Sequence, residues 1–245
     1  MSEQVQGIIP EFALKPVHSD KGVSMDKWRV VQNIRTEENV AIVSRNYNLV
    51  QHSEIMSRFQ EIAGKLNLQP GKVSFSKNSA HMHILAKFTN TQIVVDKKVG
   101  DIVDYGVAIE NSVDKTRSIR ISAYTFRLKC TNGMTHAQHE FGFTQRHLHL
   151  DRNGLMVAMM EKVYAAKVTL ETQYRRWTTE NINLEAAVEL VKDLPKKYQD
   201  RIELGTMTKW EFFNLLTDAN SHDNKRDMDM KLRFDRKIDA IMAAV

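Results

Sequence analysis

The chain has 245 residues and a formal net charge of +5, from 35 lysines and arginines against 30 aspartates and glutamates. This length suffices for one large domain or two small ones with a buried core. The single cysteine, Cys130, excludes an intramolecular disulfide and a zinc site built from the cysteines of one chain. The sequence shows no signal-peptide pattern and no apolar run near the roughly 20 residues that cross a bilayer. We therefore expect a soluble protein of the reducing cytoplasm.

The first part of the chain shows mainly the alternating pattern of β-strands. One helix interrupts it over residues 53–66, where apolar residues recur at helical spacing after Ser53. Asn132-Gly133 is typical of a tight turn between two strands. The expected strands cover residues 27–35, 39–43, 47–50, 80–88, 92–97, 102–109 and 117–130, with a return strand over 136–149.

The last part of the chain has the period of helices. Apolar residues recur at helical spacing from residue 153 to about 179, and Thr208-x-x-Glu211 is a capping-box pattern. Further helices are expected over residues 184–191, 210–216 and 224–244. The pattern predicts an α+β fold, with a curved antiparallel sheet packed against a long helix. We expect a core domain over residues 1–182 and a helical C-terminal region over 183–245.

Within the long strand over 117–130, the apolar residues change from odd to even positions. Ile119, Ile121 and Ala123 occupy odd positions, whereas Phe126 and Leu128 occupy even ones. A strand changes its buried face only at a bulge or a change of partner, which we expect near residues 122–124. This register places Cys130 on the apolar face, and arginine and lysine at positions 127 and 129 on the solvent side.

A cationic sheet face of this kind can follow a phosphate backbone, with aromatic or histidine rings stacking on bases where they are exposed. The candidate nucleic-acid-binding residues are Lys87, Arg117, Arg120, Tyr124, Arg127, Lys129 and Arg146, with His81 or His83 as further stacking candidates. The alternative is an ordinary solvated face whose charges are neutralised by Asp101, Asp104, Glu110 and Asp114 on adjacent strands. The sequence alone leaves both open.

Two His-x-His pairs allow a metal-dependent enzyme as an alternative function. The pairs are His81 with His83 and His147 with His149, and a carboxylate such as Glu140 or Asp151 would have to complete the site. No motif for zinc hydrolysis, phosphate cradling or dinucleotide binding accompanies them. We therefore expect no catalytic residues, no metal and no cofactor.

The last helix carries equal numbers of both charges and an apolar stripe that includes Phe234, Ile238 and Met242. Such a helix packs on its own domain or on a neighbouring subunit. A third possible function is therefore that of an interaction protein acting through its C-terminal helices.

Several short motifs resemble the phage/plasmid-like family called domain of unknown function nine-three-two. In chain order they are Asn46-Tyr47-Asn48-Leu49-Val50, Asn111-Ser112-x-Asp114, Arg127-x-x-Cys130-x-Asn132-Gly133 and Arg146-His147. The resemblance spans about residues 40–180 and implies a setting in a phage, plasmid or other mobile element. The sequence departs from the family pattern at residue 115, where lysine stands in place of the usual glycine.

The expected sheet-then-helix order is also similar in architecture to the Rad-type and Red-type single-strand annealing proteins. These assemble as rings or filaments that hold single-stranded DNA in a cationic groove. The leading hypothesis is therefore a non-enzymatic, oligomeric protein of phage or plasmid recombination that binds single-stranded DNA and anneals strands.

Overall fold

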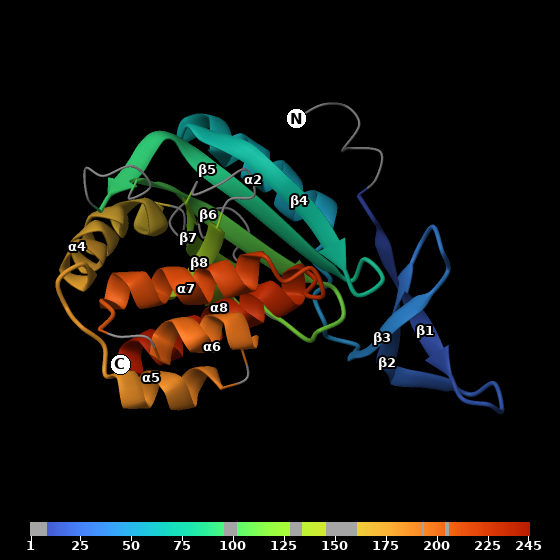
Figure 1. The fold of residues 1–245 in the computed structure, drawn as a ribbon. Coiled ribbons are helices and arrows are strands. Elements are labelled where there is room, and N and C mark those ends of the chain that lie inside the picture. Colours follow the sequence, from blue (N-terminus) through green and yellow to red (C-terminus); the bar gives the residue numbers. More distant parts are fainter. Residues whose placement is uncertain (1–8, 96–101, 128–133, 146–160, 193, 204–205) are drawn as a thin grey trace. The chain divides into compact units, whose positions relative to one another are not determined.

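A computed structural model describes residues 9–95, 102–127, 134–145, 161–192, 194–203 and 206–245 (Figure 1). The described strands form a three-stranded sheet in the order β1-β2-β3 and a five-stranded sheet in the order β4-β5-β6-β7-β8. Their bounds are β1 (Phe12–His18), β2 (Ser24–Asn33), β3 (Asn39–Ser44), β4 (Leu68–Ser76), β5 (His81–Val94), β6 (Ile102–Ser112), β7 (Ile119–Arg127) and β8 (Met134–Gln145). The helices are α2 (His52–Lys65), α4 (Lys167–Trp177), α5 (Leu184–Val191), α6 (Lys196–Glu203), α7 (Lys209–Ser221) and α8 (Met228–Ala244).

The predicted α+β class is confirmed, with antiparallel sheets and a helical C-terminal region. The strands expected over 80–88 and 92–97 form one strand, β5, up to Val94, in which Asn90 has a positive φ of 55°. Residues 47–50, expected as a strand, form an irregular segment instead. Elements β1, β4 and α6 were not predicted.

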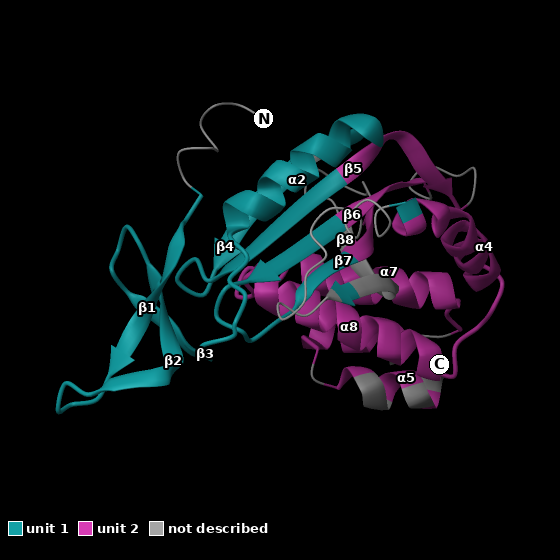
Figure 2. Cartoon of the chain, turned by 180° about the vertical axis from the view of Figure 1, so that it is seen from behind, with its two compact units in different colours: residues 1–86, 108–121, 143–161 teal, residues 87–107, 122–142, 162–245 magenta. Residues whose placement is uncertain are grey.

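The chain divides into two compact units, which Figure 2 distinguishes by colour. Unit 1 comprises residues 1–86, 108–121 and 143–161, and unit 2 comprises residues 87–107, 122–142 and 162–245. A boundary between residues 182 and 183 stays a prediction.

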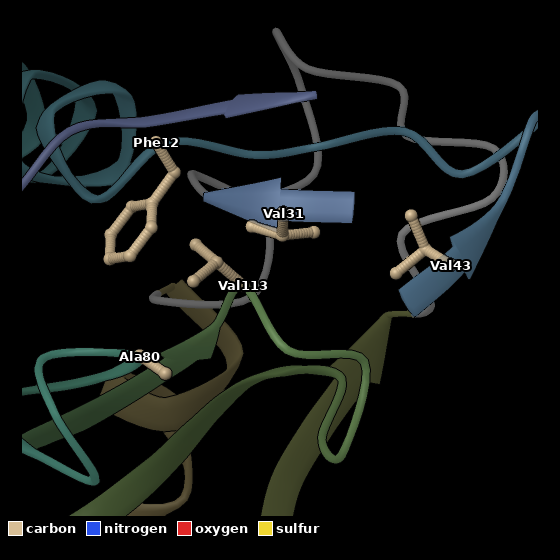
Figure 3. Packing of buried hydrophobic residues seen from close by; sticks show 5 residues of the cluster. All are labelled: Phe12, Val31, Val43, Ala80 and Val113. Carbon is tan, nitrogen blue, oxygen red and sulfur yellow. The ribbon is translucent and has the colours of Figure 1, made fainter. Parts of the chain in front are cut away.

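In unit 1, the three-stranded sheet has a buried inner face and an open outer face. Five buried side chains form the inner core: Phe12, Val31, Val43, Ala80 and Val113 (Figure 3). Because strand side chains alternate between faces, Trp28 and Val30 of β2 lie opposite Val31. Lys15 and Ile42 pair with Val30 across the sheet and share this outer face.

Helix α2 of unit 1 matches the helix predicted over residues 53–66. It buries an apolar stripe that includes Ile55, Met56 and Phe59. It leads into β4, where Gly71 runs close to the backbone of β5: a Cβ at Gly71 would lie 2.5 Å from the carbonyl oxygen of Leu85. Only glycine fits this approach without a backbone shift.

Unit 2 has an aromatic core between α4 and α7. The rings of Tyr174 and Trp177 of α4 pack against Trp210 and Phe213 of α7, with centroids 5.0–5.4 Å apart for three of the pairs. The predicted capping box at the start of α7 is confirmed, since Thr208 and Glu211 each bond the other's backbone. Helix α8 buries Ile238, Ile241 and Met242 and packs on its own chain, where it contacts α7.

Candidate nucleic-acid interface

The predicted cations that the structure describes are divided between the two units, and two of them are paired with carboxylates. In unit 2, the Lys87 Nζ lies 2.7 Å from an Asp104 carboxylate oxygen and 3.8 Å from the centre of the Phe126 ring. Burial raises the pKa of Asp104, but hydrogen bonds from Lys87 and Gln92 outweigh burial and lower this pKa overall. Asp104 is one of the four acidic residues that the sequence offered as partners of the cations. At Lys87 the structure therefore agrees with the alternative of a sheet face whose charges are neutralised.

In unit 1, Arg117 is likewise paired. Its Nη1 lies 3.0 Å from a Glu110 carboxylate oxygen, and both side chains are largely buried. Arg120 is half-buried, and its Nε donates to Thr144 Oγ1 at 3.3 Å. The guanidinium of Arg117 is therefore not open in the way that the cationic-groove hypothesis requires.

In its described part up to Thr125, β7 shows no open side. Residues 121–125 are all buried, polar Ser122 and Thr125 included, because both faces of the strand are covered there. Tyr124 is only 4% exposed, so its expected role as a stacking residue is wrong. The side chain of Arg127, and all of Lys129, Cys130 and Arg146, lie outside the described residues.

The first histidine pair is buried and does not form a shared site. His81 bonds Asp114 and Thr116, whereas His83 lies 3.3 Å from Ser76 Oγ. Both are 1% exposed, so the exposure that stacking on bases requires is not met. His147, His149, Asp151 and the side chain of Glu140 fall outside the described residues. Within the described part of the chain, no group of three or more histidine, cysteine or acidic residues is placed to hold a metal ion.

Asp114 is the centre of a charged cluster in unit 1. Its carboxylate accepts hydrogen bonds from Lys77 Nζ at 2.6 Å, from Thr116 Oγ1 at 2.6 Å and from His81 Nε2 at 3.1 Å. Burial by itself raises the pKa of Asp114, but the bonds from His81, Lys77 and Thr116 outweigh burial and hold that pKa well below its usual range. Asp114 is therefore ionised at neutral pH.

Two of the four motifs that resemble the family, residues 46–50 and 111–114, meet beside this cluster. Tyr47 donates to the carbonyl of Val113 at 3.3 Å, and the Asn111 amide donates to the carbonyl of Val50 at 3.1 Å. The same amide donates to His52 Nδ1 at 3.0 Å, so His52 Nε2 carries the proton that bonds the Ser79 carbonyl at 2.9 Å. These hydrogen bonds join the segment before α2 to the end of β6, which gives these two motifs a structural role.

A hollow of about 380 Å³ opens next to Asp114. It lies where three connections of unit 1 meet: β2–β3, β4–β5 and β6–β7. The residues that line it are Glu38, Asn39, Val40, Lys77, Asn78, Ala80 and Asp114. Non-glycine residues with positive φ occur in all three connections, namely Glu37, Lys77, Asn78, Ser79 and Lys115.

The outer face of the three-stranded sheet was not singled out in the sequence. The Trp28 side chain is 42% exposed and Ile42 is 54% exposed. Trp28 pairs with Ser44, and the backbone N–H of Arg45 donates to the carbonyl of Lys27 at 2.8 Å, so Lys27 and Arg45 lie at the same end of the sheet as Trp28. The sequence feature that could have indicated this surface is Lys-Trp-Arg at the start of the strand predicted over residues 27–35, where a tryptophan stands between two cations.

The cations around Trp28 differ from Lys87 and Arg117 in their pairing. No ion pair joins Lys15, Lys27, Arg29 or Arg45 to an acidic side chain of the described residues. Arg29 Nη1 instead donates to the carbonyls of Asp26 and Trp28. The nearby Asp26 carboxylate accepts from Ser24 Oγ at 2.8 Å. An exposed indole with unpaired cations at the same end of the sheet is a combination typical of surfaces that bind single-stranded nucleic acid.

Comparison with known proteins gives a family match. No curated protein and no solved structure matches the chain. In the described part of the chain, no helix has both the length and the apolar character needed to cross a membrane. The model of the family described as "Domain of unknown function (DUF932)" matches residues 39–240, which is most of the chain. The predicted resemblance is thereby confirmed, and the protein belongs to the DUF932 family.

Proposed function

We propose that this DUF932 protein binds single-stranded DNA and anneals complementary strands in phage or plasmid recombination, acting as an oligomer without covalent chemistry. One observation carries the proposal: the exposed Trp28 on an open sheet face, with Lys15 on the same face and three further cations at the same end of the sheet, none of which has an acidic partner among the described residues. The phage or plasmid setting rests on the family motifs. The annealing step rests on the likeness of an antiparallel sheet followed by helices to annealing proteins.

The indole of Trp28 supplies a stacking surface. The other two tryptophans, Trp177 and Trp210, are 5% and 6% exposed and belong to the aromatic core of unit 2. Trp28 instead lies on the outer face beside Val30 and Ile42, where a base can stack without displacing core residues. Stacking of one base on an aromatic side chain contributes about 1–3 kcal/mol and tolerates any base. Such a surface favours unpaired strands, because bases in a duplex are already stacked.

The cations supply the phosphate contacts. Lys15 shares the outer face with Trp28. Lys27 and Arg29 flank Trp28 in β2 and, because strand side chains alternate, project from the other face; with Arg45 they lie at the Trp28 end of the sheet. A cation without a carboxylate partner can neutralise a phosphate and release its counterion, whereas Lys87 and Arg117 would first have to leave Asp104 and Glu110. A strand held by its phosphates and by stacking keeps its base-pairing edges free for a complementary strand.

Tryptophan fluorescence tests the proposal directly. Titration with an oligothymidylate should quench the emission of Trp28, because it is the exposed tryptophan. The Trp28→Phe variant should lose the quenching. Trp28→Ala should weaken binding by roughly 5- to 100-fold, the range that stacking of one base implies. Lys65→Ala, an exposed cation at the end of α2, is the control and should bind as the wild type does.

Two results would contradict the proposal. One is the absence of binding at low salt. The other is binding that is equally tight in Trp28→Ala and in the wild type, which would move the interface away from the three-stranded sheet.

A further inference from the structure

We propose that the hollow beside Asp114 binds one unstacked nucleobase, and that guanine is its best match. The inference deepens the proposed function, on which it rests for the source of the base, a bound DNA strand. It concerns only residues of unit 1, which lie apart from Trp28 in the register of the three-stranded sheet.

The first argument is the size and the polarity of the hollow. A volume of about 380 Å³ accommodates a base with part of its sugar. Val40 and Ala80 provide small apolar walls, as a planar ring requires, while charged and amide side chains occupy the rest of the lining. Ligand sites typically combine apolar walls with a few polar groups that fix orientation.

The second argument is the backbone of the β4–β5 connection. Lys77, Asn78 and Ser79 have φ values of 53°, 52° and 67°, a run in a conformation that costs non-glycine residues about 1 kcal/mol or more each. Glycine would adopt it without strain. This run places the side chains of Lys77 and Asn78 at the hollow. Glycines at these positions would avoid the strain but would bring no side chains to the hollow. Such backbone strain is found at ligand sites as well as in tight turns, and here it coincides with the hollow.

The third argument is the hydrogen-bonding capacity of the lining. The Glu38 carboxylate and the Asn78 amide have no hydrogen-bond partner among the described residues, although both belong to the lining. Lys77 uses one of its three N–H groups on Asp114 and has two left for a ligand. The lining thus offers an anionic acceptor, a cationic donor and a free amide.

Guanine complements this set best among the four bases. Its N1–H and N2–H₂ groups form a pair of adjacent donors that a carboxylate such as Glu38 accepts. Its O6 and N7 are the two acceptors that lysine and amide side chains commonly contact. Thymine has no exocyclic amine to donate to Glu38, and adenine has no carbonyl to accept from Lys77. Cytosine has both an amine and a carbonyl, but it lacks the double donor edge.

The fit to a base is better than the fit to a phosphate or a divalent cation. Glu38 and the ionised Asp114 repel an anion, and Asp114 is already engaged by Lys77, Thr116 and His81. The ammonium of Lys77 in the same hollow repels a metal ion. A neutral ligand with donors and acceptors on one edge meets neither objection.

The test uses deoxyguanosine, which carries no phosphate and therefore does not depend on strand binding. Isothermal titration of the full chain should show saturable binding of deoxyguanosine and at least tenfold weaker binding of thymidine and deoxyadenosine. Glu38→Gln, which replaces one acceptor by a donor, should weaken deoxyguanosine binding by about tenfold or more. Asn78→Gly, which keeps the positive φ, should also weaken it.

Glu37→Gln is the matched control, because Glu37 lies in the same turn but does not line the hollow. It should bind as the wild type does. Oligothymidylate binding, measured in parallel, separates the two proposals. Strand binding without any nucleoside binding overturns the base site and leaves the proposed function standing. Deoxyguanosine binding without strand binding overturns the proposed function and leaves the base site standing. Equal binding of all four nucleosides overturns the preference for guanine.

Discussion

At the scale of single residues, His136 of β8 lies between two carboxylates of α8. Its Nδ1 is 3.1 Å from Asp235 and its Nε2 is 2.9 Å from Asp239. Burial lowers the pKa of His136, but the charges and hydrogen bonds of both aspartates outweigh burial and raise it to about 10. The imidazolium therefore joins the sheet to the last helix within unit 2.

His136 makes the stability of unit 2 sensitive to alkaline pH. Because its pKa rises from about 6.5 to about 10 on folding, its contribution is complete below pH 6.5 and is lost as the pH rises through 10. Urea unfolding should show a free energy of unfolding that falls from pH 7 to pH 10. His136→Gln should be less stable at pH 7 by roughly 3–5 kcal/mol and should fall less steeply. His18→Gln, an exposed control, should keep the wild-type slope; an equal slope for His136→Gln would contradict the assignment.

Asp114 predicts the opposite dependence, at acid pH. Its pKa is lowered on folding, so its contribution is complete above its ordinary value of 3.8 and is lost as the pH falls through the lower folded value. Asp114→Asn should cost roughly 2–4 kcal/mol at pH 7, because Lys77 and His81 lose a charged acceptor. Asp104→Asn breaks a partly exposed pair and should cost only about 0–1 kcal/mol. Urea unfolding measures both changes. If Asp114→Asn and Asp104→Asn lowered the free energy of unfolding by similar amounts, the interactions of Asp114 would not be stronger than those of Asp104.

At the scale of elements, strong periodicity made α2, β6, α5 and α8 predictable, and a capping box fixed the start of α7. Elements β1 and β4 carry Pro16, Pro70 and Gly71, which weaken a strand pattern, and α6 has only eight residues. The site was less predictable. Whether Lys87 or Arg117 is paired depends on contacts between strands, which alternation along one strand does not reveal.

Two glycines give a matched test of the elements of unit 1. Gly71→Ala should destabilise the protein, because the new Cβ meets the Leu85 carbonyl at 2.5 Å in the neighbouring strand. Gly64→Ala lies within α2, where nothing is within 4 Å of the new Cβ. It should stabilise the protein by about 0.5–1 kcal/mol, since alanine favours a helix. Thermal melts of both variants test these expectations. A stabilised Gly71→Ala variant would show that β4 and β5 lie farther apart at Gly71 than the 2.5 Å contact implies.

At the scale of the whole molecule, a net charge of +5 does not by itself identify the surface that meets DNA. Four cations near Trp28 should give a slope of log K against log salt of about −3 on single strands, from roughly 0.7 for each contact. The double variant Lys27→Ala/Arg45→Ala should reduce this slope by about 1.4. The double variant Lys87→Ala/Arg117→Ala should leave the slope unchanged. If this variant lowered the slope and Lys27→Ala/Arg45→Ala did not, DNA would bind at the cations of the strand face predicted from the sequence.

Annealing makes a demand that binding alone does not. One three-stranded sheet contacts only a few nucleotides, so an extended strand must be held by several copies with their Trp28 faces along it. We therefore expect the rate of annealing of two complementary strands to rise steeply with the ratio of protein to DNA, and light scattering to show complexes of several subunits. Trp28→Ala should lose annealing and binding together. The opposite result would be tight binding of strands by a monomer that does not accelerate their pairing. In that case the protein binds single strands but does not anneal them.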